Sequence, residues 1–192
     1  VALVAERGRY MQEAVPAGAG AMAAILGLDD EKVIEMCTQA AEGQIVSAVN
    51  FNSPGQVVVA GHSEAVQRAV DLAKASGAKM AVILPVSVPS HCALMEPAAQ
   101  RLAEKLAALD VAAPGIPVIN NVAVETASDP DAIRDALARQ LYNPVRWVET
   151  IHKMSGQGVD TLVECGPGKV LAGLNKRIDR KMKALPVYDP AT

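Results

Sequence analysis

The sequence has few residues of the kinds that form disulfides or bind metals. Its 192 residues include 3 cysteines, an odd number with no Cys-x-x-Cys pair, which argues against a disulfide framework and a structural zinc site. Its 3 histidines are far apart in the sequence and none has a paired ligand nearby, so we expect no metal centre. Unpaired cysteines are typical of reduced thiols and predict a cytoplasmic protein.

The sequence also lacks the charge excess and the apolar runs that nucleic acids and membranes require. Lys and Arg number 18 against 21 Asp and Glu, a net charge of −3, so we expect no nucleic-acid partner. No apolar run approaches the roughly 20 residues that span a bilayer, so we expect no membrane segment. Residues 1–7 have no signal-peptide pattern and resemble the middle of a helix, which indicates an artificial or processed start.

What is present, 51% hydrophobic and 20% charged residues, is typical of a globular protein. Within it, residues 18–86 show the periodicities of a strand, helix, strand, strand, helix and strand. The expected strands are 21–28, 44–51, 56–60 and 79–86, and the expected helices begin after Asp29 and Asp30 and with Ser63 as N-cap. This order is that of the ferredoxin-like split βαβ motif, whose two ends lie side by side. We therefore expect an inserted subdomain at 18–86.

The remaining residues, 1–17 and 87–192, contain many helices and few strands. We expect helices at 1–14 and 92–109, helices opened by Asp129-Pro130, Asn143-Pro144 and Gly166-Pro167-Gly168, and strands at 117–120 and 161–165, the last one buried. Two or three strands among these helices form an incomplete doubly wound α/β layer. The fold class is therefore α/β, and the strands need neighbours that this sequence does not supply.

His91 is the first candidate for chemistry. It follows the strand-like residues 86–88 and precedes a helix, so it lies on a loop at the carboxyl end of a strand, where ligand sites gather in α/β proteins. A neutral imidazole there can act as a general base towards a hydroxyl. The alternative is a surface histidine beside a helix N-terminus, and the residues alone favour that alternative.

Ser63 is the only serine in a setting close to a nucleophile elbow, the G-x-S-x-G turn between a strand and a helix. The run Gly61-His62-Ser63-Glu64-Ala65 has alanine where the second glycine allows the sharp turn. Ser63 also has an alternative explanation as a helix N-cap. We therefore reject it as a nucleophile, and the sequence contains no other candidate serine.

Three further polar segments have a functional and an ordinary interpretation. Arg7 can clamp a carboxylate through two hydrogen bonds, or it is an ordinary exposed charge on an amphipathic helix. Residues 50–56 form a polar hairpin loop that either contacts a ligand or satisfies its own turn. Residues 175–183 form a basic helix end that either docks an acidic partner protein or is a solvated last turn. In each case the residues alone favour the ordinary interpretation.

Six stretches, in the same order, together resemble the malonyl-CoA:acyl-carrier-protein transacylase family of fatty-acid synthesis. The most specific of them are the runs N-F-N-S-P-G-Q at 50–56 and P-S-H-C-A-L-M at 89–95. The others are residues 7–16, 20–25, 139–145 and 166–171. The similarity covers nearly the whole chain.

The resemblance implies a role for five residues. The family's histidine base falls on His91, and the backbone carbonyl that holds its other ring nitrogen falls on Gln140. The arginine that binds the free carboxylate of malonyl falls on Arg7. Asn52 and Gln56, in the loop near the family's cleft, are the implied substrate contacts. No metal ligand and no cofactor are implied.

The resemblance also implies a fold and partners. The fold is a partial α/β-hydrolase-like core, residues 1–17 and 87–192, with a ferredoxin-like subdomain at 18–86. The substrate is malonyl-CoA, and the partner is acyl carrier protein, whose phosphopantetheine thiol receives the malonyl group from an acyl-serine.

The sequence departs from the family in lacking the G-H-S-L-G elbow with its serine and the glutamine-rich loop that supplies an oxyanion donor. Both belong before Val1, so the chain resembles the later part of the enzyme, and the partner of this part is a missing amino-terminal segment. We expect the isolated chain to be inactive. The alternatives are an inactive interaction module and a fragment of a polyketide-synthase acyltransferase.

Overall fold

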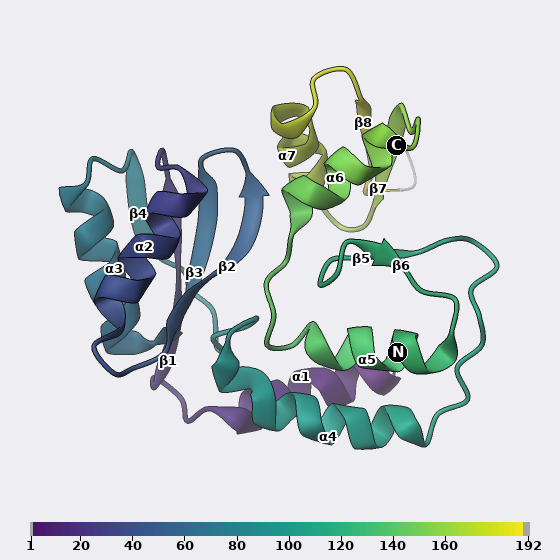
Figure 1. The fold of residues 1–192 in the computed structure, drawn as a ribbon, viewed down its shortest axis with the longest axis horizontal. Helices are drawn as coiled ribbons and strands as arrows, with labels where there is room; N and C mark the ends of the chain where they lie inside the picture. The colour runs from purple at the N-terminus through teal and green to yellow at the C-terminus, as the bar shows by residue number, and fades with distance from the viewer. Residues whose placement is uncertain (1, 190–192) are drawn as a thin grey trace.

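The structure is a computed structural model that describes residues 2–189. The chain forms a four-stranded sheet with two helices on one side and, beside it, a largely helical region that carries two small sheets (Figure 1). None of the helices in residues 2–189 is long and apolar enough to cross a bilayer. The result is a mixed α/β structure, as the sequence predicts.

Residues 20–83 form the four-stranded sheet and its two helices. The elements are β1 (Gly20–Leu26), α2 (Asp30–Ala41), β2 (Val46–Ser53), β3 (Gln56–His62), α3 (Ser63–Ala75) and β4 (Met80–Ile83). The strand order is β2-β3-β1-β4, and every pair is antiparallel. Helices α2 and α3 cover one face (Figure 1), where side chains such as Ile25, Val33, Val59 and Val66 are fully buried. The predicted order of strands and helices is confirmed.

The ends of all four strands differ from the prediction by one to three residues, and two of the differences, in β4 and at the start of α3, have a visible structural reason. Strand β4 is shorter than the predicted 79–86, because only β1 pairs with it. Ser63 is the first residue of α3 and not its N-cap; its hydroxyl donates to the Gly18 carbonyl at 2.7 Å. Gly18 belongs to the segment that connects α1 to β1, and its carbonyl is a hydrogen-bond acceptor that the sequence pattern does not reveal. The Ser63 hydroxyl thus links the start of α3 to the segment before β1.

Gly61 allows β2 and β3 to approach closely. A Cβ at this position lies 2.0 Å from the backbone oxygen of Ile45. We expect Gly61→Ala to lower the free energy of unfolding by about 3 kcal/mol or more, because the backbone must shift to relieve the overlap. Urea denaturation measures this. Gly173→Ala is the matched control, since its helical Cβ meets nothing within 4 Å and its stability should change by about 1 kcal/mol at most; equal effects at both positions contradict the prediction.

The helical region packs α1 (Ala2–Ala14), the short 3-10 helix η1 (Ala93–Met95), α4 (Glu96–Ala107) and α5 (Pro130–Arg139) against one another. Their shared core includes Met11, Met95, Leu102, Leu106 and Leu141. Asp129 caps α5 as predicted, because its carboxylate accepts a hydrogen bond from the Ala132 amide at 2.9 Å. The remaining elements are β5 (Ile119–Asn120), β6 (Glu125–Thr126), α6 (Trp147–Gly156), β7 (Thr161–Cys165), α7 (Val170–Ile178) and β8 (Lys183–Val187).

The prediction that Asn143-Pro144 opens a helix is wrong. Helix α6 begins only at Trp147, and the Asn143 side chain donates to the Arg139 carbonyl at the end of α5. The residues between pair with the edge strand β2: the Val145 amide donates to Val49, and the Phe51 amide donates to Val145. Backbone pairing with a free sheet edge therefore replaces the expected helical turn.

The predictions for the last 30 residues need two corrections. Strand β7 is not buried, since Val163 is 53% exposed, and it pairs in parallel with β8, which the sequence analysis missed. Residues 175–183 are not one basic helix end, because α7 ends at Ile178 and Lys183 begins β8. Leu185 of β8 is 50% exposed. The small parallel sheet therefore presents an uncovered apolar face, although parallel strands are normally buried on both sides.

Candidate active site

His91 lies where the chain passes from the four-stranded sheet into the helical region. Its backbone has φ +67°, the left-handed region that side chains other than glycine rarely adopt. The amide of His91 donates to the Leu141 carbonyl at 2.9 Å, which anchors the loop to the turn after α5. Such a conformation costs about 1 kcal/mol or more and persists only where the surroundings enforce it. Strain of this kind clusters at functional sites, so it directs attention to this residue.

The imidazole of His91 is held by the backbone. Its Nδ1 lies 2.7 Å from the carbonyl oxygen of Gln140, the contact that the resemblance implies. Because a carbonyl only accepts hydrogen bonds, Nδ1 carries the proton and Nε2 keeps its lone pair. This is the tautomer that a general base working through Nε2 requires.

The surroundings keep this ring neutral. Burial lowers the pKa of His91 from its ordinary value of 6.5, hydrogen bonding to the Gln140 backbone opposes that change, and the nearby charge of Arg7 lowers the pKa further. The net shift is downward. At pH 7 the imidazole is therefore free to accept a proton.

Arg7, on α1, is half-buried and not the exposed surface charge that the residues alone favour. Its neighbours are paired: Glu6 with Lys105 at 3.2 Å, and Arg9 with Glu13 at 3.8 Å. The guanidinium of Arg7 has neither an ion pair nor a hydrogen bond to any part of residues 2–189. Burial lowers its pKa, but an arginine stays charged at any physiological pH. The site thus contains a partly desolvated cation that lowers the pKa of His91.

The segment after α5 joins three parts of the site. The carbonyls of Gln140 and Leu141 hold the ring and the amide of His91, while Val145 pairs with β2. The Gln140 side chain closes the turn by donating to the Asn143 carbonyl at 3.3 Å. Backbone carbonyls have no signature in a sequence, so only the resemblance could indicate Gln140.

Asn52 and Gln56, the implied substrate contacts, differ in their surroundings. Asn52 is half-buried in β2, next to the strand residues that pair with Val145, and its side chain hydrogen-bonds to nothing in residues 2–189. The side-chain oxygen of Gln56, Oε1, accepts a hydrogen bond from the Arg177 guanidinium of α7 at 2.9 Å. That contact ties α7 to the sheet and leaves less of Gln56 available to a ligand.

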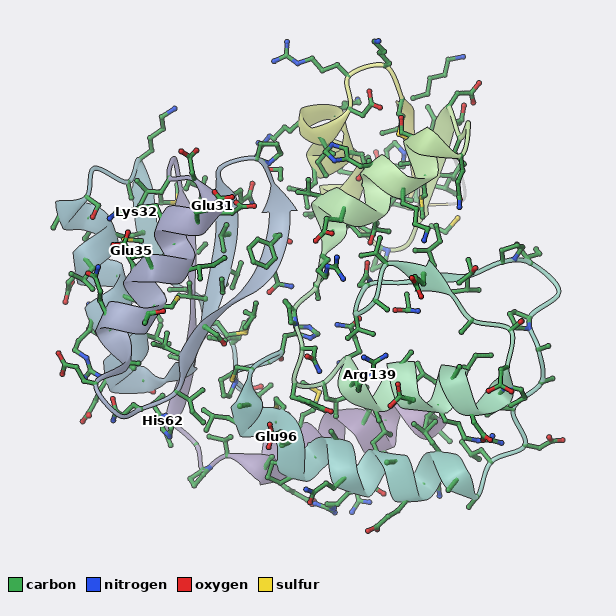
Figure 2. All side chains as sticks on the ribbon, viewed as in Figure 1. Glu31, Lys32, Glu35, His62, Glu96 and Arg139 are labelled. Atoms are coloured by element: carbon green, nitrogen blue, oxygen red, sulfur yellow. The ribbon has the colours of Figure 1, made fainter. Side chains whose placement is uncertain are left out.

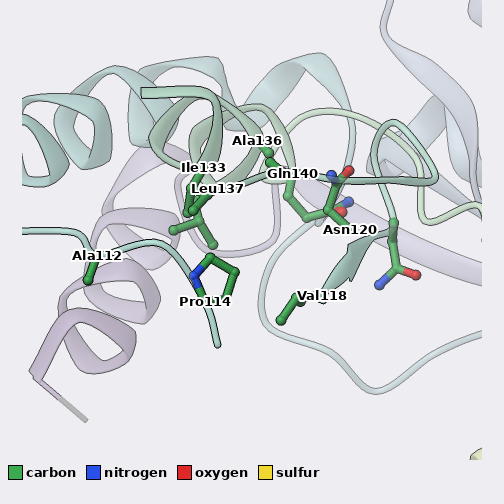
Figure 3. A pocket seen from close by; sticks show the side chains of 10 residues that line it. Ala112, Pro114, Val118, Asn120, Ile133, Ala136, Leu137 and Gln140 are labelled. Atoms are coloured by element: carbon green, nitrogen blue, oxygen red, sulfur yellow. The ribbon is translucent and has the colours of Figure 1, made fainter. Parts of the chain in front are cut away.

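A cavity of about 380 Å³ borders Gln140 (Figure 3). Ile133, Ala136 and Leu137 of α5 line one wall, and the others come from residues 112–127. The lining is mostly apolar. This cavity has no signal in the sequence, because its walls come from separate segments.

The other reactive side chains lie elsewhere or are engaged. The Nδ1 of His62, at the end of β3, accepts a hydrogen bond from the Ile45 amide at 2.9 Å (Figure 2). Lys32 and Glu35 form an ion pair on the exposed surface of α2 (Figure 2). Within residues 2–189, three or more His, Cys, Asp or Glu side chains nowhere come together as a metal site requires.

Cys92 is adjacent to His91 but does not form a nucleophile–base pair with it. Its thiol is 1% exposed and donates to the Pro89 carbonyl at 3.2 Å. Burial raises the pKa of this thiol to about 11. A reactive cysteine needs an exposed thiolate, so Cys92 does not replace the serine.

A strained histidine whose ring is held by a carbonyl, beside a half-buried arginine, is an arrangement suited to acyl transfer. The family described as the acyl transferase domain matches residues 1–187, and the chain belongs to that family.

Within the family, the chain is similar to malonyl transacylases. It is 60% identical over 191 residues to the malonyl CoA-acyl carrier protein transacylase of Escherichia coli K12, and the match covers 100% of this chain and 62% of that protein. A crystal structure of the acyl carrier protein S-malonyltransferase of Vibrio cholerae superposes with a TM-score of 0.97 at 60% identity, over 99% of this chain and 62% of that one.

A second similar structure, PlMCAT:AntF, is a malonyl-transacylase in complex with a type II polyketide-synthase acyl-carrier protein. It superposes with a TM-score of 0.97 at 57% identity, over 99% of this chain and 62% of the transacylase. The chain thus spans about 62% of the length of its curated relative from E. coli K12.

Proposed function

We propose that this chain is the base-bearing part of a malonyl-CoA:acyl-carrier-protein transacylase. The observation that carries the proposal is the contact between His91 Nδ1 and the Gln140 carbonyl at 2.7 Å, near the charge of Arg7, which has no ion-pair partner in residues 2–189. The contact with Gln140 leaves Nε2 of His91 as the base, and the positive charge of Arg7 matches an acyl substrate that ends in a carboxylate.

The reaction proceeds in two acyl transfers. A serine supplied by a segment outside this chain attacks the thioester carbonyl of malonyl-CoA, and Nε2 of His91 takes its proton. The carbon–sulfur bond then breaks, and the coenzyme A thiolate leaves with the proton from the imidazolium. The phosphopantetheine thiol of the carrier protein next attacks the malonyl-serine ester while Nε2 takes the thiol proton. The serine oxygen leaves and recovers that proton, so the site returns to its starting state.

Arg7 selects the substrate. The malonyl carboxylate accepts two hydrogen bonds from the guanidinium, an arrangement that an acetyl group cannot make. Asn52, with its free amide, and Gln56 contact the acyl chain or the coenzyme arm. Every step transfers a proton or an acyl group, so the reaction needs no cofactor.

The finer description of the fold is also part of the proposal. Residues 18–86 are a ferredoxin-like subdomain, supported by the antiparallel strand order β2-β3-β1-β4 with two helices on one face. Residues 1–17 and 87–192 are part of an α/β-hydrolase-like core, supported by the parallel pair β7–β8. The enzyme works in the cytoplasm, as its unpaired cysteines indicate.

The partner of the completed enzyme is an acyl carrier protein. Exposed cations in the last turn of α7 and in the residues after it offer a surface to an acidic partner. They are Lys176, Arg177, Arg180, Lys181 and Lys183. The similar transacylase in complex with a polyketide-synthase carrier protein supports this assignment. It also leaves a polyketide carrier as the alternative recipient, which a comparison of transfer rates to both carriers decides.

A second candidate function, an assembly module without activity of its own, is favoured by the uncovered apolar face of β7–β8. Val163 and Leu185 are about half exposed there. An apolar face of this kind marks a surface that another segment covers. In this interpretation the chain only binds the segment that covers this face and has no catalytic activity.

One chimera tests both candidates. It joins the amino-terminal part of the E. coli relative to this chain, which matches the carboxyl-terminal 62% of that protein. We expect the chimera to move malonyl from malonyl-CoA to the carrier thiol, and the 192-residue chain alone to show no transfer and no stable label from radioactive malonyl-CoA. The control is the chimera with alanine in place of the elbow serine. Stoichiometric labelling of the chain alone, or an inactive but folded chimera, contradicts the proposed function.

A further inference from the structure

The turn that carries His91 is closed by a side chain. Residues 88–92 bend sharply: the Ser90 amide donates to the Val88 carbonyl at 3.0 Å, and His91 takes its positive φ. The Pro89 carbonyl accepts a hydrogen bond from the Cys92 thiol at 3.2 Å. This bond spans His91, so the thiol fixes the distance between the two sides of the strained residue.

The same side chain anchors the turn on the four-stranded sheet. Cys92 is 1% exposed and packs in a small apolar cluster with Met22, Val49, Val58 and Ala60, which come from β1, β2 and β3. These residues lie on the sheet face opposite α2 and α3, since their neighbours in the strands fill the other core. Pro89 also touches the sheet, because a Cβ on Gly20 would lie 2.4 Å from its ring. The turn is thus seated on the sheet at both of its ends.

The chemistry of the thiol suits a donor. Burial keeps it protonated, with a pKa raised to about 11, so its S–H remains available throughout the physiological range. The carbonyl of the buried residue Pro89 thereby gains a hydrogen-bond donor that water supplies poorly there.

We propose that Cys92 is a positioning residue for His91: by packing on the sheet and donating its S–H to the Pro89 carbonyl, it holds His91 in the left-handed conformation in which Nδ1 reaches Gln140. The consequence for catalysis rests on the proposed role of His91 as the base. The positioning itself is measurable without any transfer reaction.

The test compares three substitutions in the 192-residue chain. Cys92→Ser keeps a donor, Cys92→Val fills the space without one, and Cys92→Ala removes both. Two NMR signals of His91 report the outcome at a pH where the ring is neutral: its ring ¹⁵N shifts, which give the tautomer, and its one-bond Cα–Hα coupling, which separates positive from negative φ. Cys37→Ala is the matched control, since Cys37 is also buried, 4% exposed, but lies in the core between the sheet and helices α2 and α3.

We expect Cys92→Ser to keep the Nδ1–H tautomer and the positive φ, and Cys92→Ala and Cys92→Val to lose both. Cys37→Ala should lower the melting temperature and leave the His91 signals unchanged. In the chimera, Cys92→Val should lower kcat by about tenfold to a hundredfold with little change in KM, as expected when a reacting group is displaced. If Cys92→Ala does not fold, the serine and valine variants decide the question.

The proposal is overturned if Cys92→Val retains the His91 signals, or if Cys92→Ser loses them. Either result makes Cys92 an ordinary core residue. A failure of the proposed function is a separate outcome, in which His91 keeps its position in the unsubstituted chain while the chimera does not transfer malonyl.

Discussion

Replacing His91 with alanine in the chimera is expected to lower the kcat/KM of malonyl transfer by 10²–10⁴-fold, the usual contribution of a general base. The loss follows from the geometry, because Nδ1 is engaged with Gln140 and Nε2 is the nitrogen left to take the serine proton. Initial rates of transfer to the carrier thiol measure the effect. The variant should still bind malonyl-CoA, since Arg7 and the sheet remain.

The matched control is His152→Ala, which removes an exposed histidine from α6 and should leave the rate unchanged. A second check is the pH dependence of the unsubstituted chimera. The neutral imidazole is the active form, and the pKa of His91 lies below 6.5, so activity should be retained at pH 6.5 and fall only at lower pH. An acid limb centred above pH 6.5, or equal rates for the two histidine variants, contradicts the assignment.

Much of the fold could be predicted from the sequence, because local patterns dominate it. The alternation in β1–β3 and the helical periodicity of α2 and α3 predict the element order of residues 20–83. The N-cap Asp129 and Pro130 mark the start of α5 in the same way. Each of these signals lies within a few residues of the structure that it specifies.

The errors occurred where a distant segment decides the structure. Asn143-Pro144 has the signature of a helix start, but Val145 pairs with the edge of β2. Strand β8 is short, contains Pro186 and pairs only with β7, so its own residues predict little. Tertiary pairing overrides local preference in both places.

In the candidate site, too, some features follow from the local sequence and others depend on distant segments. The residue types of His91 and Arg7 suggest chemistry, but their proximity depends on how α1 and the turn after α5 pack. The half-buried state of Arg7 and the carbonyl of Gln140 are properties of the fold. Without the family resemblance, the residues alone favour a surface position for both His91 and Arg7. The structure adds the strain at His91 and an Arg7 guanidinium that is half-buried and has no ion-pair partner in residues 2–189.

Replacing Arg7 is expected to change which acyl group the chimera accepts. Two charge-assisted hydrogen bonds to the malonyl carboxylate together contribute about 3–4 kcal/mol, so Arg7→Ala should lower the malonyl kcat/KM by 10²–10³-fold. Acetyl-CoA has no carboxylate, and its kcat/KM should remain the same or rise as the desolvated charge is removed. Arg7→Lys should recover only part of the malonyl rate, because an ammonium cannot form the paired bonds.

The test measures both substrates with Arg7→Ala and with Arg9→Ala, two residues further along α1. The Arg9 side chain is 58% exposed and pairs with Glu13, so its loss should leave the malonyl preference unchanged. If Arg7→Ala lowers malonyl and acetyl transfer equally, the residue maintains the structure and does not select the substrate. If the preference collapses only at Arg7, the selectivity originates in the one cation near His91 that the fold leaves half-buried and without a partner in residues 2–189.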